Sequence, residues 1–127
     1  MRDYFLFDTG ADVSIMPSHV LKTISKTRRS ELMPHGLTIH AGNATKVECD
    51  GVSLVKFRLR VEEFKFHFYI CPAATIPLLG LDMHEKFDLH LWQGKRMLYK
   101  GWDPLCSAYR ADEYINKKRS TRCRIFM

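Results

Sequence analysis

Hydrophobic and polar residues alternate most regularly in the middle of the chain. The apolar residues fall first on odd and then on even positions: Val55, Phe57, Leu59 and Val61, followed by Phe64, Phe66, Phe68 and Ile70. A period of two is typical of a strand with one face buried, so these runs predict two antiparallel strands whose aromatic stripe lies in the core. The change of parity predicts that the chain turns at Glu62-Glu63.

Shorter apolar runs predict further strands on both sides of this pair. The ranges expected to be strands are 4–7, 13–16, 37–39, 45–47, 89–92 and 97–99. Pro17 favours a short helix over 19–24, and Asp82 favours a second over 82–87, since a carboxylate stabilises the amino end of a helix. His84 and His90 flank this second helix and are expected at the surface. The pattern therefore predicts an all-β fold with one or two short helices.

The length and the hydrophobic profile limit the class of protein. At 127 residues the chain is expected to form one domain with a substantial core. No apolar stretch approaches the length of a membrane-spanning helix. Asp3 and Asp8 interrupt the apolar start, which therefore does not have the pattern of a signal peptide. We expect an intracellular, cytoplasmic protein without a membrane partner.

Cysteine spacing argues against a metal centre. The four cysteines are Cys49, Cys71, Cys106 and Cys123. They are widely separated and include no C-x-x-C pair, which is the spacing that structural zinc sites favour. We therefore expect reduced cysteines rather than zinc ligands, with no metal and no cofactor.

The positive charge is concentrated at one end of the chain. The formal net charge is +6, and all of the excess lies in residues 93–127. The residues of the densest basic run are Lys117, Lys118, Arg119, Arg122 and Arg124. Because periodicity also fades beyond Gly101, we expect a domain over 1–100 and a basic tail over 101–127 that is a linker or disordered. A solvated end is the simpler interpretation of the run, and phosphate contacts with nucleic acid are the alternative.

Candidate chemistry lies at Asp8, in the segment Asp8-Thr9-Gly10-Ala11-Asp12 between two apolar runs. Burying an unpaired carboxylate costs several kcal/mol, so a carboxylate at the end of a buried strand suggests a function. Two close carboxylates share one proton and can activate a water molecule for peptide hydrolysis. The chain contains a single Asp-Thr-Gly and is too short for a second lobe. A two-fold homodimer would supply the second carboxylate.

Two separate motifs resemble those of retropepsins, the aspartic proteases of retroviruses and long-terminal-repeat retrotransposons. The segment 6–14, Leu-Phe-Asp-Thr-Gly-Ala-Asp-Val-Ser, is similar to their active-site segment. The segment 76–83, Ile-Pro-Leu-Leu-Gly-Leu-Asp-Met, is similar to their second marker and follows at a suitable distance. The sequence Leu-Gly-x-Asp at 79–82, followed by Phe-Asp-Leu at 87–89, resembles Gypsy-type proteases most, and also the retropepsin-like domain of ubiquitin-shuttle proteins. The resemblance implies an acid-protease closed barrel with a flap hairpin around Gly42.

The resemblance also implies a role for each matching residue. Asp8 would be the catalytic carboxylate, Thr9 would hydrogen-bond across the dimer, and Gly10 would allow the substrate backbone to approach closely. The implied substrate-binding residues are Ala11, Asp12, the flap tip Ala41, Gly42 and Asn43, and the pocket residues Ile76, Leu78 and Leu79. Only seven residues precede Asp8. We therefore expect the family's amino-terminal strand to be missing or to lie in a longer precursor.

The expected function is that of an aspartic endopeptidase of retroelement type, active as a homodimer on a polyprotein. Two other hypotheses stay open. One is an inactive module that keeps the fold for dimerisation or peptide binding. The other is nucleic-acid binding through the basic tail, whose signature would be affinity that falls steeply with salt and requires residues 101–127.

Overall fold

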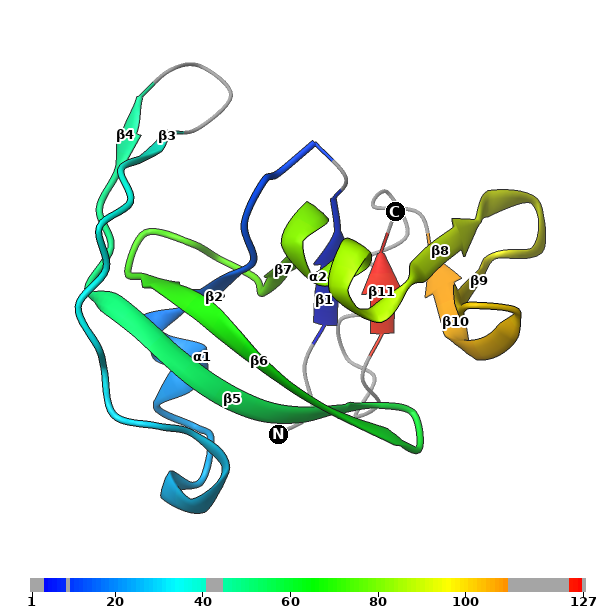
Figure 1. Ribbon diagram of the computed structural model, residues 1–127, viewed down its shortest axis with the longest axis horizontal. Coiled ribbons are helices and arrows are strands. Elements are labelled where there is room, and N and C mark those ends of the chain that lie inside the picture. The colour runs from blue at the N-terminus through cyan, green and yellow to red at the C-terminus, as the bar shows by residue number, and fades with distance from the viewer. Residues whose placement is uncertain (1–3, 9, 41–44, 110–123, 127) are drawn as a thin grey trace.

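The computed structural model describes residues 4–8, 10–40, 45–109 and 124–126, and its architecture is mostly β with short helices (Figure 1). The strands are β1 (Tyr4–Phe7), β2 (Ile15–Pro17), β3 (Ile39–His40), β4 (Lys46–Val47), β5 (Gly51–Leu59), β6 (Glu62–Cys71), β7 (Leu78–Leu79), β8 (Leu89–Trp92), β9 (Met97–Lys100), β10 (Asp103–Tyr109) and β11 (Arg124–Phe126). The helices are α1 (Ser18–Leu21), η1 (Lys26–Arg28), α2 (Leu81–Phe87) and η2 (Gln93–Lys95). No helix in the described ranges is long and apolar enough to cross a membrane.

One nine-stranded sheet organises these elements in the order β5-β6-β2-β7-β1-β11-β10-β9-β8. Within the described residues, β5 and β8 are therefore the two ends of the strand order. β1 lies near the middle, between β7 and β11, and is parallel to both. The β3–β4 hairpin forms a separate two-stranded sheet and projects from the body of the molecule (Figure 1).

The long hairpin of β5 and β6 supplies much of the core. Inward-facing residues of both strands are almost completely buried, among them Val55, Phe57, Phe64 and Phe68. Their rings pack at 5.5 to 5.7 Å between centroids for the Phe57–Phe68 and Phe57–Phe64 pairs. Burying one such side chain stabilises the fold by about 2–3 kcal/mol. The predicted strand pair and its aromatic core are confirmed.

The turn between these strands lies two residues earlier than the parity pattern predicted. Arg60 and Val61 form the turn, and Glu62 is already paired with Leu59 in the ladder. The main-chain angle φ of Arg60 is +61°, which reverses the chain tightly. Val61 is 83% exposed, so its assignment to the buried face was wrong. A turn built from arginine and valine carries no glycine, proline or asparagine signal.

The structure also differs from the expected tail over residues 101–127. β10 pairs with β9, and its Leu105 and Ala108 are buried in the core. The β9–β10 register shifts between Pro104 and Cys106, which breaks the two-residue alternation by which a strand is identified in sequence. Farther along, β11 pairs with β1 and β10. The basic residues Lys117, Lys118, Arg119 and Arg122 lie outside the described residues, and Arg124 is the first residue of β11.

Candidate active site

Asp8 follows directly after β1, in the centre of the sheet. The neighbouring strand β7 holds it through the main chain, since the amide of Asp8 donates to the carbonyl oxygen of Leu79 at 3.0 Å. Phe5 and Phe7 fix β1 in the core with exposures of 1% and 6%. The carboxylate is half-buried. A rigid buried strand therefore delivers one acidic group to the edge of the core.

The main chain after Asp8 folds back onto its carboxylate. The amide of Gly10 donates to Oδ1 of Asp8 at 2.9 Å, and the amide of Ala11 donates to the Asp8 carbonyl at 3.3 Å. A hydrogen bond from a main-chain amide fixes the direction of the carboxylate. Thr9, expected to act across a dimer, lies outside the described residues.

The first residues of α2 support the loop that follows Asp8 through main-chain hydrogen bonds. The amide of Leu81 donates to the Ala11 carbonyl at 2.7 Å, and the amide of Asp82 donates to the Asp12 carbonyl at 3.2 Å. Gly80 approaches the loop so closely that a Cβ atom there would collide with the main chain of Val13. The two motifs recognised in the sequence are thus in direct main-chain contact.

Ser14 and Asp82 form a polar link between the same two segments, and sequence reasoning did not assign it. Ser14 is fully buried, and its hydroxyl donates to Oδ1 of Asp82 at 2.8 Å while accepting the amide of Gly80 at 2.9 Å. Asp82 also accepts the amides of Ser14 and Met83 at 3.1 and 2.7 Å. Buried polar groups satisfied in this way make the arrangement specific. The two residues are 68 positions apart, so only knowledge of the pairing would have revealed the contact.

His84 was expected at the surface, and this was wrong. Its ring stacks on Phe7 with 3.7 Å between centroids and 11° between planes, and the residue is only 5% exposed. Among the residues that the structure describes, neither ring nitrogen has a hydrogen-bond partner. Burial lowers the pKa of His84 below its usual value, and the nearby Leu79 main chain and the Asp82 and Asp8 carboxylates oppose this more weakly. A neutral imidazole therefore packs beneath the strand that carries Asp8. His90, in contrast, is exposed as expected.

The other predicted substrate-binding residues are only partly brought together. Ala11 is half-buried and Asp12 is exposed beside the Asp8 loop. Ile76 and Leu78 are half-buried, whereas Leu79 is completely buried and packs into the core. The expected flap tip, Ala41, Gly42 and Asn43, lies outside the described residues, although its stem is present. In that stem Ile39 pairs with Val47.

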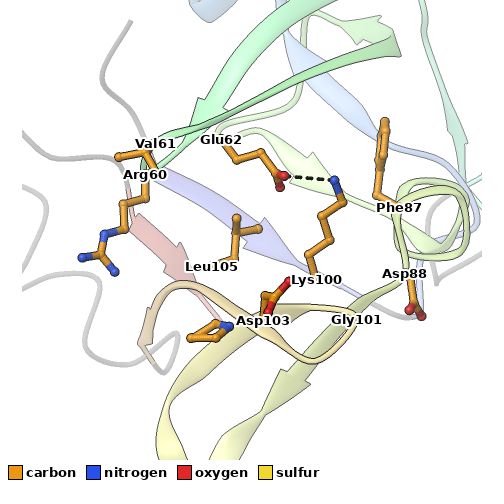
Figure 2. A pocket seen from close by; sticks show the side chains of 10 residues that line it. Arg60, Val61, Glu62, Phe87, Asp88, Lys100, Gly101, Asp103 and Leu105 are labelled. Atoms are coloured by element: carbon orange, nitrogen blue, oxygen red, sulfur yellow. Dashed lines mark hydrogen bonds and ion pairs between the residues drawn. The ribbon is translucent and has the colours of Figure 1, made fainter.

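Three cavities lined by described residues lie away from Asp8. One, of about 530 Å³, opens between the β5–β6 turn, the end of α2 and the β9–β10 turn (Figure 2). In it Lys100 Nζ donates to Glu62 Oε1 at 3.0 Å. The others, of about 360 and 430 Å³, lie beside β5 and beside β6. None of the three is lined by a residue predicted to bind substrate.

Several solved structures resemble this chain, among them the following two. The retroviral protease-like domain of Ddi1 from Leishmania major superposes with a TM-score of 0.59 and 18% identity, over 81% of this chain and 82% of that one. The EIAV protease complexed with the inhibitor HBY-793 superposes with a TM-score of 0.54 and 20% identity, over 68% of this chain and 77% of that one. The chain has a retropepsin-like fold. No protein-family model and no curated protein matches it.

The retropepsin-like fold confirms the fold class predicted from the two sequence motifs. In this chain the Asp8 loop and the Leu78–Asp82 segment are joined by the main-chain hydrogen bonds described above.

Proposed function

We propose that this protein is an aspartic endopeptidase that acts as a homodimer, with one Asp8 contributed by each copy. The observation that carries the proposal is the position of Asp8. Asp8 follows directly after a buried central strand. The amide of Gly10 fixes its Oδ1, and its side chain stays partly accessible. The retropepsin-like fold supports the same assignment. An acid held this firmly at the edge of the core is suited to position a water molecule.

The chemistry requires two such acids. Two carboxylates a few ångström apart cannot both be ionised, so the pair carries one shared proton. The ionised partner takes a proton from a water molecule between them, and that water attacks the peptide carbonyl carbon. The protonated partner donates to the carbonyl oxygen. The apparent pKa values belong to the pair rather than to either residue.

A second copy of the chain is the proposed source of the second acid. The sequence contains one Asp-Thr-Gly, so a two-fold axis beside Asp8 would bring two identical loops together. Thr9 would then hydrogen-bond between the loops.

The proposed substrate is an extended polypeptide, in the first instance a retroelement polyprotein. The β3–β4 hairpin, with Ala41, Gly42 and Asn43 at its tip, would close over it and exclude water. Gly10 would admit the substrate main chain, and Asp12, which is exposed, would accept one of its amides. Ile76 and Leu78 would contact side chains next to the scissile bond. Their apolar character predicts a preference for apolar side chains there.

A mixing experiment tests both the acid and its origin. Peptide cleavage at mildly acidic pH is measured for the wild-type chain, for Asp8→Asn and for Asp103→Asn, a change at an exposed carboxylate of β10. Asp8→Asn should lose activity by at least about a thousandfold while the other variant keeps it. Excess Asp8→Asn chain added to wild type should also inhibit, because mixed dimers hold only one acid. Asp103→Asn chain should not inhibit.

The same experiment separates the proposal from its rival. Specific activity should fall on dilution as dimers dissociate, and pepstatin should inhibit. Activity that is independent of concentration and insensitive to added Asp8→Asn chain would rule out a shared site. A stable dimer without cleavage, unchanged by Asp8→Asn, would instead identify a non-catalytic module.

A further inference from the structure

Two cysteine thiols meet at the foot of the β3–β4 hairpin. Cys71 is the last residue of β6 and has no exposed surface, while Cys49 lies between β4 and β5 and is half-buried. Cys49 is close enough to Cys71 to contribute to the raised pKa of the Cys71 thiol. Cys49 Sγ in turn donates to the carbonyl oxygen of Gly51 at 3.3 Å. Neither sulfur takes part in the proposed catalytic chemistry.

The main chain holds both cysteines in place. The amide of Asp50 donates to the Ile70 carbonyl at 2.8 Å, and Gly51 is the register partner of Ile70. Gly51 has a φ of +149°, a conformation that favours glycine, so the strand alternation stops there. The chain is thereby free to direct Cys49 toward Cys71. The same register brings Asp50 level with Cys71, so Cys49 is one residue away from the position opposite Cys71. A disulfide needs Cα atoms roughly 4.4–6.8 Å apart.

We propose that Cys49 and Cys71 are a reversible redox pair, which a peroxide converts into an intrachain disulfide. The sulfur of Cys49 attacks one peroxide oxygen and the O–O bond breaks, which gives a sulfenic acid and one water molecule. The sulfur of Cys71 then attacks the Cys49 sulfur, and the hydroxyl leaves as a second water molecule. Two thiols have lost two electrons and the peroxide has gained them. A dithiol reductant reverses the step by exchange.

The environments of the two sulfurs set this order of events. Cys49 has exposed surface, so peroxide reaches it first. The pKa of Cys71 is raised to about 12, mainly by burial and further by the neighbouring Cys49 and Asp50. Cys71 therefore stays protonated and does not react with peroxide itself. Oxidation of Cys49 removes the contribution of its thiol to this pKa, so the Cys71 thiolate becomes easier to form.

The bond would join the segment after β4 to the end of β6, next to the hydrogen bond from the Asp50 amide to the Ile70 carbonyl. Cys49 follows β4 by two positions, so a covalent link to the end of β6 fixes the root of the β3–β4 hairpin (Figure 1). In the oxidised form the hairpin stem has fewer conformations available. This redox step does not depend on the proposed peptidase activity and is measurable in its absence.

Mass spectrometry of the full chain tests the proposal. The chain is treated with hydrogen peroxide, its remaining thiols are alkylated, and the digest is read with and without dithiothreitol. We expect the Cys49 and Cys71 peptides joined, with a mass lower by two hydrogen atoms, and complete recovery in reductant. Cys106→Ser should cross-link equally well, whereas Cys49→Ser should not. Amide hydrogen exchange over residues 46–49 should slow severalfold on oxidation in wild type only.

Several outcomes would refute the proposal that Cys49 and Cys71 form a redox pair. They are a cross-link from Cys49 to Cys106, to Cys123 or to another chain, or sulfinic acid at Cys49 without a cross-link. Because Cys71 is fully buried, Cys71→Ala is measured beside Cys71→Ser, with circular dichroism to confirm folding. A folded Cys71 variant in which Cys49 stops at sulfenic acid supports the order of events. A folded Cys71 variant in which Cys49 still becomes cross-linked, to another cysteine, refutes it.

Discussion

Replacing Gly80 by alanine is a sharp test of how the Asp8 loop is supported. Gly80 has φ −87° and ψ −177°, an extended conformation that alanine adopts freely. The substitution therefore adds one methyl group without main-chain strain. That methyl would lie 2.5 Å from the carbonyl carbon of Val13 and 3.0 Å from the carbonyl oxygen of Ala11. Only a separation of α2 from the loop relieves both contacts.

The expected loss of stability follows from what the methyl group meets. Overpacking costs about 1–3 kcal/mol, with flexible side chains at the low end. Here both neighbours are main-chain atoms that cannot rotate away. The separation also stretches the hydrogen bond from the Leu81 amide to Ala11, which contributes about 1 kcal/mol. We expect a destabilisation of about 3 kcal/mol, which lowers the unfolding midpoint by roughly 10 °C in a chain of this size.

Urea unfolding followed by circular dichroism measures the effect, with Gly36→Ala as the matched control. A Cβ atom at Gly36 would have no neighbour within 4 Å, so that variant should stay within about 0.5 kcal/mol of wild type. Under the proposed function, Gly80→Ala should also reduce cleavage at temperatures where it is folded, because the carboxylate moves. Equal stability of the two variants would show that α2 does not pack under the loop as described.

Two further changes examine the groups around this contact. Ser14→Ala removes the hydroxyl that bridges to Asp82, and we expect a loss of about 1–3 kcal/mol in urea unfolding, against no change for the exposed Ser107→Ala. Burial lowers the pKa of His84, so the unfolded chain binds its proton more readily than the folded chain does. Above pH 6.5 the buried His84 should not lower the free energy of unfolding. Below pH 6.5 the free energy of unfolding should fall because of His84, by at most about 1.4 kcal/mol per pH unit. His84→Leu should flatten this pH dependence, and His19→Gln should leave it unchanged. An unchanged slope in His84→Leu would contradict the role assigned to His84.

Local regularities of the sequence are what made much of the fold predictable. β5 and β6 follow from strict alternation, and α2 follows from Asp82 at the start of a short run after glycine. The hairpin around residue 42 was likewise expected, and its stem is present as Ile39–His40 paired with Lys46–Val47. Each of these signals lies within a few residues, where period and turn chemistry act directly. The Asp8 loop was recognisable because its residue types are unusual between apolar strands.

Features that depend on distant partners were not predictable in the same way. His84 lies on a short helix with polar neighbours, and only the placement of Phe7 over that helix buries its ring. Leu105 and Ala108 belong to the core, yet the register shift in β10 conceals their alternation. The contact of Ser14 with Asp82 joins two segments that nothing in the local pattern relates. In each case tertiary packing decides the environment, and the residue type alone does not.

The described contacts divide the proposed site into two parts with different origins. Among the described residues, three contacts from the same chain position Asp8 and its loop: the carbonyl of Leu79, the amide of Gly10, and the segment from Gly80 to Asp82. Folding of one copy therefore sets the direction of the acid before any partner binds. Under the proposed function, the second carboxylate is supplied by association of two copies. It follows that Asp8→Asn should remove cleavage without lowering stability, whereas Gly80→Ala should lower both. If the Gly80→Ala chain cleaves normally, catalysis does not depend on how the start of α2 supports the Asp8 loop. That result would contradict the view that α2 positions Asp8 for catalysis.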